Sequence, residues 1–158
     1  GNEAIIFGKG TWEKVNPQKG TGRDTGDWEV GITNQGIIFF NILTDGSSGR
    51  VESKKKIEPG NWHHIAAMRT NPFALALYID AEKDATAELN SNITEDWKND
   101  FHLAWLGEGE ADKFFCGIID EFRWSDQALK PEELWFYKTY AVAPSGKLTV
   151  MWGELKIR

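Results

Sequence analysis

The sequence has almost no cysteine, no excess of basic charge and no long apolar run, and each of these shortages excludes a class of protein. A single cysteine, Cys116, cannot form an intrachain disulfide, so the chain is not a disulfide scaffold. Its 24 acidic and 18 basic side chains give a formal net charge of −6, which argues against nucleic acid as the main partner. No apolar run approaches the roughly 20 residues that span a bilayer, so we expect no membrane insertion.

What the chain does have is a high aromatic content. Eight Trp, nine Phe and three Tyr among 158 residues exclude a disordered chain. Sixteen Gly and five Pro are spread between short apolar runs and do not cluster in one linker. The composition therefore predicts a single domain over residues 1–158, with many turns and a core of its own.

Short segments rich in β-branched and aromatic residues predict an all-β fold. The predicted strands are residues 4–7, 28–33, 37–43, 50–57, 62–69, 74–79, 101–106, 114–124 and 148–152. The stretch 131–136 begins with Pro131 and carries two acidic residues in its first turn, which predicts one short helix. Two long polar stretches, 9–27 and 81–99, are expected to be loops, and loops of this length are often functional.

The segment GIIDEFRWSDQALKPEEL at 117–134 resembles a signature of the laminin-G-like, concanavalin A-like jelly rolls, G-x-I-D-E-V-R-I-Y followed by N-R-A-L-S-x-E-E-I. Three more segments resemble that family in its order: IFGKG at 6–10, WHHIA at 62–66 and LYID at 77–80. The resemblance implies an antiparallel two-sheet jelly-roll sandwich and an extracellular or cell-surface location. A basic segment followed by an apolar one is missing, so any secretion signal is expected outside this sequence.

Two of the departures from that family bear on the fold. Asp80 is followed by Ala81 where the family usually has Gly, so we expect this hairpin to have a longer tip. The family also has one or two strands before the segment that resembles 6–10, and here five residues precede Ile6. Three alternatives are open: this sequence is a fragment, the strand-like residues 147–152 fill the place, or another chain donates a strand. The last would make a homo-oligomer through an open sheet edge.

Metal chemistry has one candidate. The resemblance implies that Asp120, in the I-D-E strand, helps to hold a structural Ca²⁺, which prefers oxygen ligands. The alternative is that Asp120 and Glu121 make structural hydrogen bonds or an ion pair with Arg123. His63 and His64 are adjacent on a predicted strand, so they point to opposite faces and do not form a metal pair.

No catalytic motif stands out. The carboxylate groups at 82–88 and 108–112 come closest to the paired acids of glycoside hydrolases, but their spacing or turn context does not match. Cys116 lies within a predicted strand, and the chain has no nucleophile elbow. We therefore predict a protein that is not an enzyme, with a polysaccharide-cleaving enzyme of the same fold as the alternative.

The tryptophans are the best candidates for binding. Trp62, Trp105 and Trp124 fall in predicted strands and are expected in the core. Trp12, Trp28 and Trp97 lie in or beside the long polar loops, and we predict that they bind the ligand, although Trp28 also fits the start of a core strand. The sequence thus predicts a noncatalytic module that recognises a glycan or an extracellular protein, with an assembly module as a further alternative.

Overall fold

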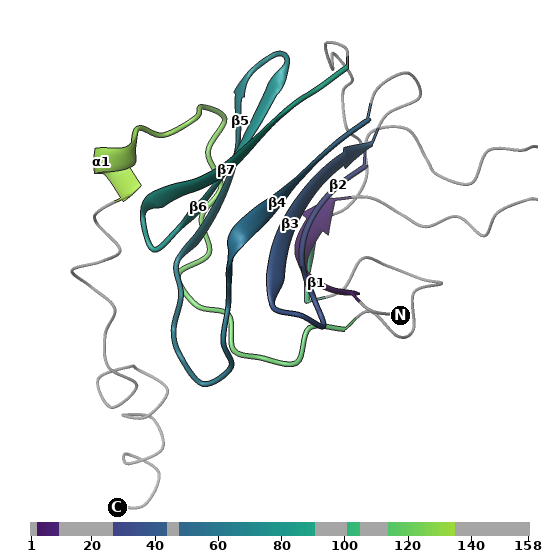
Figure 1. Cartoon of the computed structure of the whole chain (residues 1–158), viewed down its shortest axis with the longest axis vertical. Helices are drawn as coiled ribbons and strands as arrows, with labels where there is room; N and C mark the ends of the chain where they lie inside the picture. The colour runs from purple at the N-terminus through teal and green to yellow at the C-terminus, as the bar shows by residue number, and fades with distance from the viewer. Residues whose placement is uncertain (1–2, 10–26, 44–47, 91–100, 105–113, 135–158) are drawn as a thin grey trace, which may run out of the picture.

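A computed structural model describes residues 3–9, 27–43, 48–90, 101–104 and 114–134 of the chain (Figure 1). Eight strands and one short helix lie in these ranges. They are β1 (Glu3–Lys9), β2 (Asp27–Thr33), β3 (Ile37–Leu43), β4 (Ser48–Lys56), β5 (Ile65–Asn71), β6 (Ala74–Ile79), β7 (Glu82–Glu88), β8 (Phe101–Leu103) and α1 (Pro131–Leu134).

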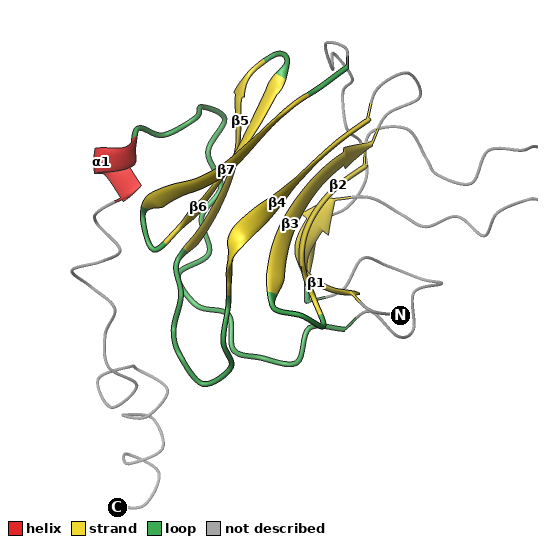
Figure 2. Ribbon diagram, viewed as in Figure 1, coloured by secondary structure: helices red, strands yellow, loops and turns green. Residues whose placement is uncertain are grey.

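The described strands form two antiparallel sheets, which confirms the predicted two-sheet sandwich. One sheet has the order β4-β3-β2-β1-β8, and the other has the order β5-β6-β7. Figure 2 shows the two sheets as separate layers, with α1 beside the three-stranded sheet. β2 pairs with β3, β5 with β6, and β6 with β7 through turns of two or three residues, so this part of the topology follows directly from chain order.

The core lies between the sheets and is built by the period of two along each strand. Alternate side chains of β2 and β3 point to the interior, and those of β6 meet them from the other sheet. The main cluster consists of Trp28, Val30, Ile38, Phe40, Ile42, Val51, Leu75, Leu77, Ile79, Ala85 and Leu89. Full burial of one such large side chain stabilises the fold by about 1.5–3 kcal/mol, so this layer is the main source of stability.

Both sheets are also partly covered on their outer faces. On the five-stranded sheet, Phe39 packs against Ile5, and the guanidinium of Arg50 lies 4.1 Å from the centre of the Phe39 ring. On the three-stranded sheet, Leu134 of α1 joins a buried cluster with Met68, Ala76, Tyr78 and Ala81. The short helix is therefore anchored by one apolar side chain, which is 2% exposed.

The predicted strand at 114–124 is wrong. In this segment the described backbone makes one isolated parallel bridge, between Phe114 and Ile5. Ile118 is 77% exposed and Trp124 is 64% exposed, so these two apolar side chains are not buried as the strand prediction required. The segment has the composition of a strand, but beyond the bridge at Phe114 it pairs with none of the described strands.

The polar stretch at 81–99 is also not a loop throughout. It contains β7, because Ala85 and Ala87 alternate with polar residues and pack on the core side of the hairpin with β6. The predicted strand at 148–152 lies outside the described residues. The ends of the remaining predicted strands lie within three residues of the observed ends. Residues 105 and 106 of the predicted segment 101–106 lie outside the described residues.

The hairpin between β6 and β7 does not have the longer tip that the sequence suggested. Its loop has two residues, Asp80 and Ala81, with φ of 55° and 65°. Positive φ at both positions is the pattern of a type I′ turn, which matches the twist of the flanking strands. Ala81 keeps this conformation without glycine because its side chain is 5% exposed and packs in the Leu134 cluster.

Candidate functional site

A cleft of about 1510 Å³ lies between the two sheets. Its floor is apolar, because inner-face residues of β2, β3 and β5 line it. Its rim is polar and comes from two irregular segments, 61–64 and 118–129. Five acidic and three basic side chains line it: Asp80, Glu82, Asp120, Glu121 and Asp126 against Lys55, Arg69 and Arg123.

Trp28, which the sequence suggested as a ligand-binding residue, is a core residue. It is 3% exposed, and its ring is stacked at 4.8 Å on the ring of Trp124. Phe7 meets the same indole edge-on at 6.1 Å. This corrects the ligand-binding assignment in favour of the strand-start alternative. Trp12 and Trp97 lie outside the described residues, so their role stays a prediction.

Trp62 and Trp124, which were expected in the core, are exposed on the cleft. Their exposed fractions are 45% and 64%, and both line the cleft. The prediction failed for Trp62 because β5 begins only at Ile65, so this residue lies in the turn that follows Pro59 and Gly60. That Pro-Gly pair was the signal for a loop. Trp105 lies outside the described residues.

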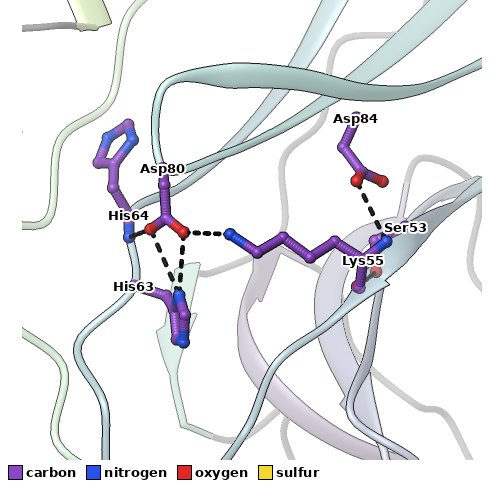
Figure 3. Close-up of polar contacts among 6 residues, drawn as sticks. All are labelled: Ser53, Lys55, His63, His64, Asp80 and Asp84. Carbon is purple, nitrogen blue, oxygen red and sulfur yellow. Dashed lines mark hydrogen bonds and ion pairs between the residues drawn. The ribbon is translucent and has the colours of Figure 1, made fainter.

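Asp80 is the centre of a polar cluster at one end of the cleft (Figure 3). Its Oδ2 accepts a hydrogen bond from Lys55 Nζ at 2.6 Å and lies 3.1 Å from His63 Nδ1. Its Oδ1 accepts the backbone N–H of His64 at 3.1 Å, and its own N–H donates to the His64 carbonyl at 2.8 Å. Asp80 thus joins the β6–β7 turn, the end of β4 and the segment before β5.

The electrostatics of the cluster follow from this geometry. Burial alone would raise the pKa of Asp80, but the hydrogen bonds from Lys55, His63 and His64 outweigh it and hold the pKa below its usual value. The same contact raises the pKa of Lys55. Burial lowers the pKa of His64, and the negative charge of Asp80 offsets part of that effect. The geometry therefore favours the ionised form of Asp80, and burial favours the neutral form of His64.

A bulge in β4 brings the other half of the cluster into place. Two steps along β3, from Phe39 to Ile37, correspond to four steps along β4, from Glu52 to Lys56. Ser53 fills the gap in the ladder, since its Oγ accepts the Ile38 N–H at 3.0 Å and donates to the Lys55 carbonyl at 2.8 Å.

The N–H groups that the bulge turns outward meet the carboxylate of Asp84 on β7. Its Oδ2 accepts the Lys54 N–H at 2.5 Å, and its Oδ1 accepts the Lys55 N–H at 3.1 Å. Asp84 therefore links the edges of the two sheets, which is a structural task. Of the carboxylates considered for catalysis at 82–88, this one is already engaged, and the group at 108–112 lies outside the described residues.

The two adjacent histidines contribute different groups to the Asp80 cluster. The His63 ring contacts Asp80, whereas His64 contributes its backbone N–H. They precede β5, so strand alternation, the reason given from the sequence, is not what separates them. Within the described ranges, no group of three His, Cys, Asp or Glu side chains is arranged to hold a metal ion.

Asp120, the suggested calcium ligand, is exposed at the rim of the cleft. Its Oδ1 accepts the backbone N–H of Glu121 at 2.9 Å, a local hydrogen bond of the kind that the structural alternative expected. Ca²⁺ takes six to eight oxygen ligands. The acidic side chains of the described residues do not form such a set around Asp120, so they do not by themselves make a calcium site.

Comparison with known proteins identifies the family. The family model described as the concanavalin A-like lectin/glucanases superfamily, a laminin G family, matches residues 6–134. The comparison with curated proteins found no match. A crystal structure of residues 221–444 of an S-layer domain-containing protein from Clostridium thermocellum ATCC 27405 matches with 21% identity and a TM-score of 0.34. The match covers 73% of this chain and 56% of that one, so this chain spans little more than half of that structure.

No helix among the described residues is long and apolar enough to cross a membrane. The family match covers most of the chain and includes all four segments that carried the resemblance. The chain belongs to the concanavalin A-like lectin/glucanases superfamily.

Proposed function

We propose that this protein is a noncatalytic, extracellular recognition module that binds a carbohydrate at the rim of the cleft. The observation that carries the proposal is the exposure of Trp62 and Trp124 along one cleft. Indole rings bind the apolar faces of sugars because they bury a large area and retain a polar edge. Trp124 is well prepared for this, since the stacked ring of Trp28 supports it from one side.

The polar rim supplies the second requirement of a sugar site, which is a set of fixed donors and acceptors for hydroxyl groups. Asp120 and Glu121 offer carboxylates there, and Arg123 offers a guanidinium. The cleft exceeds the usual 300–1,000 Å³ of small-molecule pockets, which favours an oligosaccharide over a single sugar.

A glycan array tests this proposal, followed by calorimetry with the best glycan. We expect Trp124→Ala to weaken binding by about 5- to 150-fold, because a buried aromatic contact of this kind contributes about 1–3 kcal/mol. Phe73→Ala is the matched control, since Phe73 is also an exposed aromatic, at 52%, but does not line the cleft. No binding to any glycan, or equal losses for both variants, would refute the carbohydrate site.

The same glycan also tests the noncatalytic character of the module. We expect no release of reducing ends on prolonged incubation. If the parent protein released reducing ends and the Glu82→Gln variant did not, the protein would be a polysaccharide-cleaving enzyme of this fold, and the proposal would be wrong. Glu82 is the suitable residue because it is exposed and lines the cleft, whereas Asp84 is held by β4.

Assistance by Ca²⁺ through Asp120 is part of the proposal and has its own test. A metal that binds only the native state raises the melting temperature as its concentration rises. We expect the melting temperature to rise between EDTA and millimolar CaCl₂, and Asp120→Asn to remove the increase. An unchanged melting temperature in the parent protein would exclude calcium from the site.

A further inference from the structure

The floor of the cleft is an apolar layer that the described residues cover only in part: Trp124 stacks on Trp28, whereas Ile6, Ile57 and Ile65 are half-buried. Protein interiors are close-packed, with few voids larger than a water molecule. Here about 1510 Å³ between two apolar sheet faces is lined by side chains such as Ile6, Ile57 and Ile65. A polar ligand at the rim would leave this floor exposed, so a second, apolar occupant is needed.

The cleft also has an open hydrogen-bonding edge along one side. Among the described residues, β5 pairs only with β6, so its other edge has no partner strand. Residues of β5 from Ile65 to Met68 line the cleft. An edge of this kind accepts one more strand through its backbone N–H and C=O groups. The occupant that fits both the apolar floor and this edge is a β-strand with apolar side chains.

The chain itself has a suitable segment after α1. Leu134 anchors the end of the described chain on the outer face of the β5–β6–β7 sheet, against Met68 of β5. Twenty-four residues follow Leu134, and residue 147 is 13 positions further on, a reach of about 40 Å. The tail therefore starts beside the open edge and is long enough to return along it.

The sequence of the tail matches the cleft in pattern and in charge. Leu148, Val150 and Trp152 alternate with Thr149 and Met151, and Gly146 and Gly153 bound the run. Residues 135–158 carry four basic side chains and one acidic side chain. The cleft has the opposite balance, with five acidic and three basic side chains.

We propose that residues 147–152 dock in the cleft as an added strand along the free edge of β5, with Leu148, Val150 and Trp152 on the apolar floor. The tail is then the element that closes the sandwich. This proposal does not depend on carbohydrate binding, because the strand takes the floor of the cleft and the sugar takes its rim.

Amide hydrogen exchange of the full chain tests the proposal residue by residue. We expect the β5 amides that point away from β6 to be protected at least about 100-fold. Val150→Asp should remove this protection and leave the amides shared by β2 and β3 protected. Val142→Asp is the matched control, because it makes the same change in the same tail outside the segment. Unprotected outward amides in the parent chain, or equal effects of the two variants, would overturn the proposal.

A cross-link covers the case in which Val150→Asp fails to fold. In a Cys116→Ser background, Ala67→Cys on β5 combined with Val150→Cys should give an intrachain disulfide, and Ala67→Cys with Val142→Cys should not. Failure of the first pair to cross-link would overturn the docking. Cross-linking only between chains would show that a second copy donates the strand, which also overturns the intramolecular form proposed here.

Discussion

Replacing Asp80 with Asn tests the polar cluster most directly. Asn tolerates the left-handed backbone at φ 55° about as well as Asp, so the turn itself is not strained by the change. Its carbonyl oxygen still accepts the His64 N–H, but its amide group faces the donors of His63 and Lys55. A hydrogen bond to a charged group contributes about 1.5–3 kcal/mol, and the exposed Lys55 adds little. We therefore expect Asp80→Asn to lower the free energy of unfolding by about 2 kcal/mol.

Urea unfolding measures this loss as a shift of the midpoint at constant slope. The effect must also depend on pH in one direction. Because the folded pKa of Asp80 lies below its unfolded value of 3.8, its contribution is present above pH 3.8 and is lost as pH falls through the lower folded pKa. The difference between the parent protein and Asp80→Asn should therefore shrink from pH 7 to pH 3. A loss below about 0.5 kcal/mol at pH 7, or a difference that does not change with pH, would refute the reasoning.

Two further predictions concern His64 and Gly31. Burial lowers the folded pKa of His64 below 6.5, so its contribution to the free energy of unfolding should be complete above pH 6.5 and should fall as pH drops from 6.5 toward that lower pKa. The urea midpoint of His64→Gln should therefore depend less on pH than that of the parent protein. The same pH dependence in both proteins would contradict this prediction. A Cβ on Gly31 would lie 2.6 Å from the carbonyl oxygen of Ala4 and within 2.8 Å of two atoms of the Phe39 ring. Since the backbone atom cannot move aside, Gly31→Ala should destabilise the fold by about 2–3 kcal/mol in the same assay, and a neutral result would show that β1 and β2 are not packed as described.

The sequence predicted best those strands that are buried on both faces. Residues 74–79 are a continuous apolar run, and residues 37–43 are apolar except for Asn41. Both runs are bounded by turn residues, and both were predicted with the bounds that β6 and β3 have. Such runs contain their own boundary signals. Periodicity alone predicted only an antiparallel sandwich, and the four family segments added its jelly-roll type.

The failures share a physical cause, which is that alternation shows that a strand has two faces but not which face is covered. Trp28 and Trp124 both fit the strand pattern, and the structure buries the first at 3% exposure and leaves the second at 64%. Composition likewise suggested a strand at 114–124, although a strand also needs a neighbour with free backbone groups. Both errors concern contacts between residues far apart in the chain, which the local sequence does not specify.

The Asp80 cluster shows the same limit. Its members come from three separate segments, near residues 53–55, 63–64 and 80–84, so no local motif contains it. The one local signal was the departure at Ala81, and it was read as a longer loop. A longer loop would have been the natural response to the missing glycine, since a left-handed alanine costs about 1–2 kcal/mol.

The tight turn is retained because two other elements depend on it. With only two residues in the loop, the backbone of Asp80 bonds to the His64 carbonyl and its carboxylate faces Lys55 and His63. A longer tip would carry this carboxylate away from β4 and from the segment before β5. Burial of the Ala81 side chain beside Tyr78 and Leu134 returns about 0.8 kcal/mol, which offsets much of the strain. The short turn therefore places the Asp80 carboxylate within reach of Lys55 and His63. These contacts explain why the hairpin has a two-residue loop although Ala81 stands where the family usually has glycine.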